Sequence, residues 1–206
     1  MKHYLESVDL YLEIDKGLNI TSDALNLSRF IKNELKNNNK IGDCIDIGSG
    51  IGTLSFLLFR QDKINKFYCV EIQKKVYEML KKNILENKLE DKIFAFNTDI
   101  KEFMVDEYKE RFQYIVSNPP FYKVNSGKLP EDEYLKISKF EILLNLEDLF
   151  KISSYILKDD GNFFLILPYE REKEVLKNRY FDIIDSEKIL NNKKSFIMYN
   201  LKKKEK

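Results

Sequence analysis

The chain has 206 residues, which suits one folded domain, because domains usually span about 100–200 residues. Hydrophobic residues make up 43% of it and aromatic residues 13%, enough for a packed core and against a largely disordered chain. Lys and Arg (35) nearly balance Asp and Glu (34), so the strong basic excess of a dedicated nucleic-acid-binding protein is missing. The only histidine, His3, stands near the N-terminus, which excludes histidine-based triads and most zinc sites, so we expect no metal.

Two further features concern the compartment. Cys44 and Cys69 lie inside apolar runs typical of strands, so we expect buried free thiols and no disulfide framework. No apolar run reaches the roughly 18–20 residues that span a bilayer, and the first ten residues are too charged for a signal peptide. We therefore expect a cytoplasmic protein that binds no membrane.

The first 40 residues predict a hairpin and a helix. Residues 9–20 alternate apolar and polar side chains around the turn-forming sequence Asp15-Lys16-Gly17, which favours a hairpin. A helix then follows over residues 21–36, where Thr21 or Ser22 can cap its first turn. Its expected apolar face consists of Leu25, Leu27, Phe30, Ile31 and Leu35.

From residue 41 the chain alternates strands and helices. Strands are expected at 44–47, 67–70, 93–96, 114–117 and 163–167. Helices are expected at 53–59, 73–87, 141–157 and 171–178, and the apolar stripe of the second consists of Val76, Met79, Leu80, Ile84 and Leu85. A final hairpin pairs 182–190 with 195–201. This order predicts an α/β fold with a seven-stranded, mostly parallel sheet and helices on both faces. No linker divides the chain, so we expect a single domain over 1–206, with the hairpin and helix in 1–40 and the core in 41–206.

The sequence CIDIGSGIGTLSF places Gly48, Gly50 and Gly52 between a strand and a helix. Glycines there let the backbone turn sharply and approach a ligand, as in nucleotide-cofactor sites of doubly wound sheets. The spacing G-x-G-x-G differs from the dinucleotide pattern G-x-G-x-x-G. Asp46 stands two residues before the first glycine, where a carboxylate repels a pyrophosphate but suits a sulfonium ligand that also carries an ammonium group. The pattern therefore favours S-adenosylmethionine over NAD.

Acidic residues also follow the next two strands. Glu71 ends the second strand and can accept hydrogen bonds from both ribose hydroxyls of a cofactor. Asp99 follows the third strand and can either accept from an adenine amino group or cap a helix. Ile72 or Ile100 would pack against the adenine ring. Because these residues and the glycine loop follow three successive strands, they should meet at one edge of the sheet.

The sequence YIVSNPPFY places Asn118, Pro119, Pro120 and Phe121 at the end of the fourth strand. The two prolines remove N–H donors and stiffen the backbone. The Asn118 side-chain oxygen and the Pro119 carbonyl can then each accept a proton from one NH2 group, while Phe121 offers a face for stacking a planar base. Holding the nitrogen in line with a methyl donor is much of the catalysis, and no strong general base is needed.

These motifs resemble the class I methyltransferases that carry an (N/D)PP(Y/F/W) motif. The resemblance implies a Rossmann-like fold and S-adenosylmethionine as cofactor. It implies that Asp46, Gly48, Gly50 and Gly52 line the methionine end, that Glu71 and Asp99 hold the ribose and adenine, and that the tetrad holds the target nitrogen, with Asn118 also next to the cofactor.

Within that superfamily the chain is most similar to the tRNA1(Val) adenine-37 N6-methyltransferases. The segment NITSDALNLSRFI resembles a Thr- and Asp-containing stretch of that family, which implies that Thr21 and Asp23 lie near the cofactor. The resemblance also implies tRNA as partner and substrate of a monomeric enzyme. Two departures bear on the substrate: Lys139-Phe140-Glu141 replaces an Arg-His-Glu-like sequence, and Glu131, Asp132 and Glu133 stand where tRNA phosphates would approach.

Other members of the superfamily remain alternatives. The same motif serves release-factor glutamine, ribosomal-RNA guanine and DNA adenine methyltransferases, but those carry extra or duplicated domains for which this chain has little room. A protein with this fold that binds RNA or a partner without catalysis is a further alternative, against which the intact Asp46, Glu71 and Asn118 argue. Lysines that can contact tRNA are Lys123, Lys128, Lys202, Lys203 and Lys204.

Overall fold

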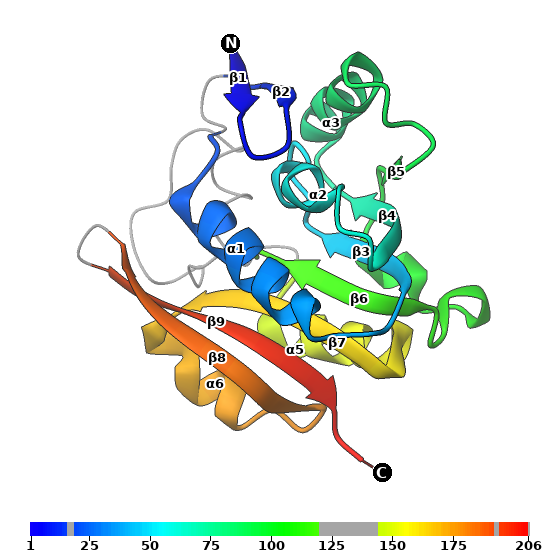
Figure 1. Ribbon diagram of the computed structural model, residues 1–206. Coiled ribbons are helices and arrows are strands. Elements are labelled where there is room, and N and C mark those ends of the chain that lie inside the picture. The colour runs from blue at the N-terminus through cyan, green and yellow to red at the C-terminus, as the bar shows by residue number, and fades with distance from the viewer. Residues whose placement is uncertain (16–18, 120–143, 192–193, 206) are drawn as a thin grey trace.

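The computed structural model describes residues 1–15, 19–119, 144–191 and 194–205 (Figure 1). Its strands are β1 (Lys2–Leu5), β2 (Leu10–Glu13), β3 (Gly42–Ile47), β4 (Ile64–Val70), β5 (Ile93–Phe96), β6 (Phe112–Ser117), β7 (Leu157–Pro168), β8 (Phe181–Asn191) and β9 (Lys194–Lys203). Its α-helices are α1 (Ser22–Lys36), α2 (Thr53–Leu58), α3 (Lys74–Glu86), α5 (Leu146–Ile156) and α6 (Glu172–Leu176). A short 3-10 helix, η1 (Ile100–Phe103), follows β5.

Seven strands form one sheet in the order β5-β4-β3-β6-β7-β9-β8. Strands β3 to β7 pair in parallel, whereas β9 runs antiparallel to both β7 and β8. The prediction of a seven-stranded, mostly parallel sheet with a C-terminal hairpin is therefore confirmed. Because β4 lies on one side of β3 and β6 on the other, the order of the chain reverses at β3, which is where such sheets bind ligands.

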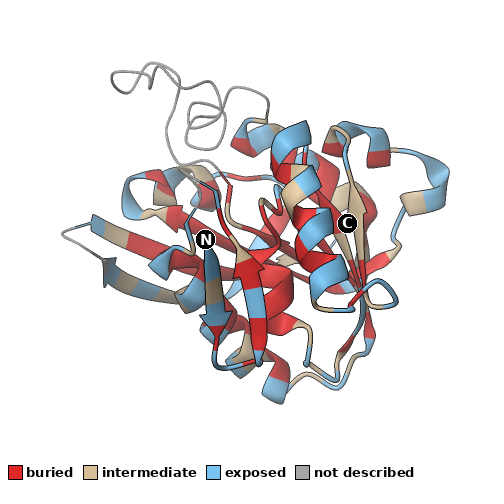
Figure 2. Ribbon diagram, turned by 90° about the horizontal axis from the view of Figure 1, so that it is seen from above, coloured by how far each residue is buried: buried red, intermediate tan, exposed pale blue. Residues whose placement is uncertain are grey.

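Apolar side chains cover both faces of the sheet. Helices α1, α2 and α3 cover one face, while α5 and α6 cover the other (Figure 1). The central strands β3 and β6 are buried almost throughout, whereas most residues of the edge strand β8 are exposed, and each helix turns its buried side inward (Figure 2). Neighbouring residues of β3 alternate between the two cores, since Cys44 packs in the first and Ile45 in the second.

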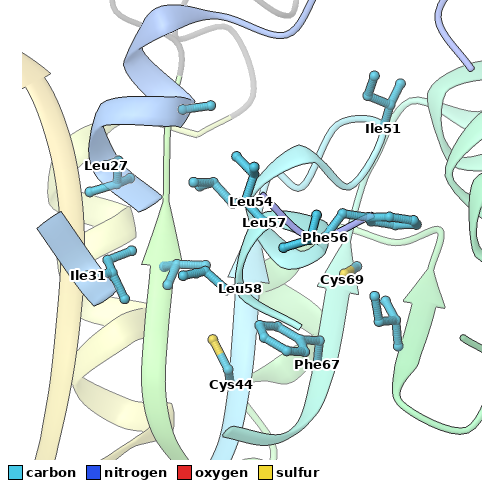
Figure 3. Packing of buried hydrophobic residues seen from close by; sticks show 14 of the residues in the cluster. Leu27, Ile31, Cys44, Ile51, Leu54, Phe56, Leu57, Leu58, Phe67 and Cys69 are labelled. Carbon is cyan, nitrogen blue, oxygen red and sulfur yellow. The ribbon is translucent and has the colours of Figure 1, made fainter. Parts of the chain in front are cut away.

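Figure 3 shows the first core where α1 and α2 meet the sheet. Leu27 and Ile31 of α1 point toward Leu54 and Leu58 of α2, above the strand side chains. Cys44 and Cys69 are fully buried there as free thiols, as expected, and burial raises the pKa of both. This packing fixes where α2 starts, and so fixes the loop between β3 and α2.

Three details of the predicted elements differ from the structure. The N-terminal hairpin pairs Lys2–Leu5 with Leu10–Glu13, and Asp9 takes a positive φ of 54° at its turn, so residues 19–20 form no second arm. Leu25 and Leu85 are 44% and 56% exposed, so neither belongs to the apolar face predicted for its helix. The helix expected at 141–157 covers Leu146–Ile156, and residues 141–143 lie outside the described part of the chain.

Candidate active site

A cavity of about 270 Å³ lies at the carboxyl ends of β3, β4, β5 and β6. Residues from these strand ends, from the glycine loop and from the start of α1 enclose it. The residues that line it are Asn19, Thr21, Ala24, Asp46, Ile47, Gly48, Ser49, Gly50, Ile51, Thr53, Leu54, Val70, Glu71, Ile72, Gln73, Val76, Thr98, Asp99, Ile100, Ser117, Asn118, Pro119 and Leu144. The structure thus brings most of the predicted site residues to one cavity, as expected from the meeting of the strand ends.

The glycine loop depends on backbone conformations that favour glycine. Gly48, Gly50 and Gly52 have φ values of 71°, 57° and 93°. A Cβ on Gly48 or Gly50 would meet no atom within 4 Å, so both glycines border open space. A Cβ on Gly52 would lie 2.7 Å from Leu80 Cδ1 and 2.8 Å from Phe56 Cε2. Gly52 therefore allows close packing behind the loop, and the structure does not place it among the residues lining the cavity.

Asp46 is buried at the cavity wall, 1% exposed. The Ser55 hydroxyl of α2 donates a 2.8 Å hydrogen bond to its Oδ2, and the Cys69 thiol donates to Ser55 Oγ at 3.1 Å. Burial raises the pKa of Asp46 from 3.8 to about 7, with a smaller contribution from the nearby Glu71 carboxylate, while the bonds from Ser55 oppose the shift. A cationic ligand in the cavity would favour the ionised carboxylate.

Glu71 is also buried, 6% exposed, directly after β4. Its Oε2 accepts from the Gly50 N–H at 3.0 Å and its Oε1 accepts from the Gln73 N–H at 2.8 Å. Burial raises the pKa of Glu71, and the backbone donors partly oppose that shift. The carboxylate therefore binds the tip of the glycine loop and the start of α3 together.

Asp99 caps a short helix, which is one of the two roles considered for it, and it also lies at the cavity. Its Oδ1 accepts from the Lys101 N–H at 3.0 Å, so it caps η1, and it lines the cavity as well. The neighbouring Asn97 donates through Nδ2 to the carbonyls of Glu71 and Ile72, at 2.8 and 3.1 Å. The ends of β4 and β5 are thereby held together at the edge of the cavity.

Asn118 and Pro119 line the cavity beyond the end of β6. Their position is fixed by Ser117, whose buried hydroxyl donates to the Ile47 carbonyl of β3 at 2.9 Å. Pro120 and Phe121, the other half of the predicted tetrad, lie outside the described residues.

At the start of α1, Thr21 caps the helix by accepting from the Ala24 N–H at 3.3 Å, and both residues line the cavity. Asp23 is buried in the first turn but does not line it. Of the two residues, Thr21 therefore lies at the cavity and Asp23 does not.

Sequence reasoning missed several cavity residues. Ser49 is the most informative, because its Oγ is buried and has no hydrogen-bond partner within the described part of the chain. Its position between Gly48 and Gly50 in the sequence is the feature that could have identified it as a cavity residue. Asn19, Gln73, Thr98 and Leu144 carry no motif of their own and reach the cavity only through the fold.

The basic residues proposed for RNA contact are only partly described. Lys203 is paired with Asp159 at 3.0 Å and Glu110 at 3.5 Å, and Lys204 donates to the Asn178 carbonyl at 2.9 Å. Lys123 and Lys128 lie outside the described residues. Among the described residues, no three His, Cys, Asp or Glu side chains group as metal ligands would, and no helix is long and apolar enough to cross a membrane.

Comparison with curated proteins finds two kinds of relative. A tRNA1(Val) (adenine(37)-N6)-methyltransferase of Christiangramia forsetii is 29% identical over 134 residues, which is 65% of this chain and 55% of the relative. A release factor glutamine methyltransferase of Clostridium botulinum is 28% identical over 178 residues, 82% of this chain and 62% of the relative. A second tRNA1(Val) (adenine(37)-N6)-methyltransferase, from Flavobacterium psychrophilum, matches this chain over 54% of its own length. The chain therefore spans little more than half the length of each of these two tRNA-modifying relatives.

Solved structures share the fold at low sequence identity. TYW2 of P. horikoshii, in complex with MeSAdo, superposes with a TM-score of 0.64 at 15% identity, over 98% of this chain and 70% of that one. The tRNA methyltransferase TrmK of B. subtilis superposes with a TM-score of 0.62 at 14% identity, over 91% of this chain and 68% of that one. The architecture is therefore Rossmann-like, as in class I methyltransferases.

The family model described as methyltransferase small domain matches residues 22–133, from the start of α1 past the end of β6. That range contains the glycine loop, Glu71, Asp99 and Asn118, which are the strand-end residues that enclose the cavity. The chain belongs to the methyltransferase small domain family.

Proposed function

We propose that the protein is an S-adenosylmethionine-dependent N-methyltransferase whose substrate is an adenine of tRNA, methylated at N6 as in adenine 37 of tRNA1(Val). One observation carries the proposal: Asp46, Glu71, Asp99 and Asn118 come from four different strand ends and line one cavity. The similarity to tRNA1(Val) (adenine(37)-N6)-methyltransferases supports the tRNA substrate.

The cavity fits the proposed cofactor on three counts. The buried Ser49 hydroxyl has no partner among the described residues, and can donate to or accept from a polar ligand. Gly48 and Gly50 leave open space where side chains would otherwise stand. Asp46 and Glu71 are two buried carboxylates whose pKa values are raised by burial, so a cationic ligand in the cavity would stabilise their ionised forms.

We assign the cofactor's contacts by strand. Asp46, Gly48 and Gly50 would hold the methionine end, Glu71 the ribose hydroxyls, and Asp99 with Ile72 and Ile100 the adenine. When bound, S-adenosylmethionine supplies an electrophilic methyl group.

The substrate nitrogen would be held by the residues after β6. The Asn118 side-chain oxygen and the Pro119 carbonyl each accept one hydrogen of the exocyclic amino group, which directs the nitrogen lone pair toward the cavity. We propose that Phe121 stacks on the base, a contact worth about 1–3 kcal/mol for a single base. As the new N–C bond formed, the bond between the methyl group and the sulfonium sulfur would break and S-adenosylhomocysteine would leave. The methylated nitrogen would then be acidic and would lose its proton to solvent, so no strong base is required of the chain.

A second candidate is methylation of a protein glutamine. The release factor glutamine methyltransferase of Clostridium botulinum matches 82% of this chain, against 65% for the tRNA-modifying relative. A glutamine side-chain amide presents the same NH2 group as adenine, so Asn118 and Pro119 fit both substrates.

The two candidates separate in one assay. The protein is incubated with S-[methyl-³H]adenosylmethionine and with unmodified tRNA, ribosomal RNA, duplex DNA or a release factor, and labelled products are identified by mass spectrometry. N6-methyladenosine in tRNA alone supports the proposal. N5-methylglutamine in the release factor would replace the proposed substrate and keep the cofactor site. No label from any substrate, together with no cofactor binding, would leave a protein that uses this fold without catalysis.

A further inference from the structure

The outer edge of the N-terminal hairpin is paired with the side chains of a helix. One edge of β2 bonds with β1, and the N–H and C=O groups of alternate residues point the other way, toward α3. On that side the Glu13 N–H donates to Asn83 Oδ1 at 2.7 Å, and Asn83 Nδ2 donates to the Glu13 carbonyl at 3.2 Å. One turn later in α3, the Asn87 side chain makes the same pair of bonds with Tyr11, at 3.0 and 2.7 Å.

This pairing works because the two spacings match. Residues four apart in a helix rise by about 6 Å, and residues two apart in a strand by about 6.6 Å. A carboxamide carries both a donor and an acceptor, so Asn83 and Asn87 replace a neighbouring strand for Glu13 and Tyr11. The exposed edge of a two-stranded hairpin is thereby satisfied without a third strand.

Asn83 differs from Asn87 in what else it touches. It is fully buried, and its Nδ2 also lies 3.3 Å from the Ile51 carbonyl, which belongs to the glycine loop at the cavity. The same face of α3 carries Val76, which lines the cavity, and Leu80, which packs where a Cβ on Gly52 would stand. Asn83 itself does not line the cavity.

The hairpin in turn precedes a cavity wall. Later along the chain than Glu13 stand Asn19, Thr21 and Ala24, all of which line the cavity. One side chain therefore bonds to the backbone of two segments that lead to different walls of the cavity.

We propose that Asn83 is a positioning residue for the cofactor site, and that it couples the N-terminal hairpin to the glycine loop through its bonds to Glu13 and Ile51. The expected loss of cofactor affinity rests on the proposed function. The coupling between the hairpin and the glycine loop does not, because it concerns the protein without ligand. Loss of the carboxamide donors should loosen both segments at once, and should weaken binding in a cavity that Asn83 does not touch.

The test compares Asn83→Asp with Asn87→Asp. Each substitution keeps the shape and one acceptor oxygen and replaces the amide donors with a second, negatively charged oxygen, but only Asn83 bonds to the glycine loop. Hydrogen–deuterium exchange of the ligand-free protein follows residues 2–15 and 48–54, and calorimetry measures the dissociation constant of S-adenosylmethionine.

For Asn83→Asp we expect faster exchange in both segments and about tenfold weaker cofactor binding, the scale of one lost hydrogen bond. For Asn87→Asp we expect faster exchange in residues 2–15 alone and binding within about twofold of the parent, since the loop keeps its bond. If residues 48–54 exchange at the same rate in Asn83→Asp as in Asn87→Asp, and both variants bind S-adenosylmethionine equally well, the coupling is refuted.

Two further measurements keep the test decisive. If Asn83→Asp does not fold, Asn83→Ser is compared with Asn87→Ser, with the same expected difference between the two positions. If the parent protein binds no S-adenosylmethionine, the proposed function fails while the exchange comparison still decides whether Asn83 couples the two segments.

Discussion

The Gly50 N–H donates a 3.0 Å hydrogen bond to Oε2 of Glu71, which ties the tip of the glycine loop to the end of β4. The carboxylate predicted to bind a ribose is thus also bonded to the loop that borders the cavity. Two bonds from backbone donors leave lone pairs on both oxygens, because an ionised carboxylate has about four acceptor sites. Glu71 can therefore shape the loop and still accept from a ligand.

Replacing Glu71 tests this double role. We expect Glu71→Ala to weaken S-adenosylmethionine binding several-fold, because both the ribose acceptor and the support of Gly50 are lost. Calorimetry gives the dissociation constant, with the exposed Glu90→Ala as control. An unchanged constant would remove Glu71 from the ribose site.

Asn118 is expected to act on catalysis and not on affinity for the cofactor. Asn118→Ala should abolish methyl transfer and leave S-adenosylmethionine binding nearly intact, because its side-chain oxygen is assigned to the substrate nitrogen. Single-turnover assays and calorimetry on the same preparation separate the two effects. Equal loss of binding and turnover would contradict the role given to Asn118.

The loop glycines should differ in what an added methyl group costs. Gly52→Ala places a Cβ against Leu80 and Phe56 at a positive φ, so we expect it to lower the free energy of unfolding by about 2–5 kcal/mol. Gly48→Ala meets no neighbouring atom, so only the backbone strain of about 1–2 kcal/mol remains. Urea unfolding compares the two variants. Equal losses would show that packing behind Gly52 does not matter.

Asp46 makes stability depend on pH. Its pKa is about 7 in the folded protein against an ordinary value of 3.8, so the folded state binds more protons than the unfolded state between those values. The stability of the ligand-free protein relative to Asp46→Asn should therefore fall as pH rises from 5 to 7, by about 2 kcal/mol.

Thermal unfolding at pH 5, 6, 7 and 8 measures that difference, with the exposed Asp91→Asn as control. Over the same range, S-adenosylmethionine should bind the parent protein more tightly as pH rises, because the ionised carboxylate favours a cation. Parallel stability curves for the parent and Asp46→Asn would show that Asp46 has no raised pKa.

The sheet was predictable because its strands are short apolar runs that alternate with amphipathic helices. Strand order around β3 and the meeting of Asp46, Glu71 and Asp99 follow from that alternation. The N-terminal hairpin was misplaced for a local reason. Leu10 and Leu12 mark one arm clearly, but Lys2–Leu5 has a single buried leucine, and the turn at Asp9 contains no glycine.

Other features depend on contacts between distant segments. Leu25 and Leu85 fit helical periodicity, yet both remain exposed among the residues that the structure describes, and a pattern within one helix cannot show where its partners end. Asn83 resembles any polar helix residue until β2 is placed beside it. Gly52 belongs to the loop motif, but a glycine is needed there because Leu80 and Phe56 leave no room for a side chain. Asp23 belongs to a segment that resembles the family, yet it does not line the cavity.

Calorimetric titration of the protein with S-adenosylmethionine, with NAD as the competing ligand, tests the cofactor site directly. We expect one site per chain for S-adenosylmethionine, weakened by Glu71→Ala, and no heat from NAD. Binding of NAD, or a failure of S-adenosylmethionine to bind at millimolar concentration, would contradict the assignment of the cavity enclosed by Asp46, Glu71 and Asp99.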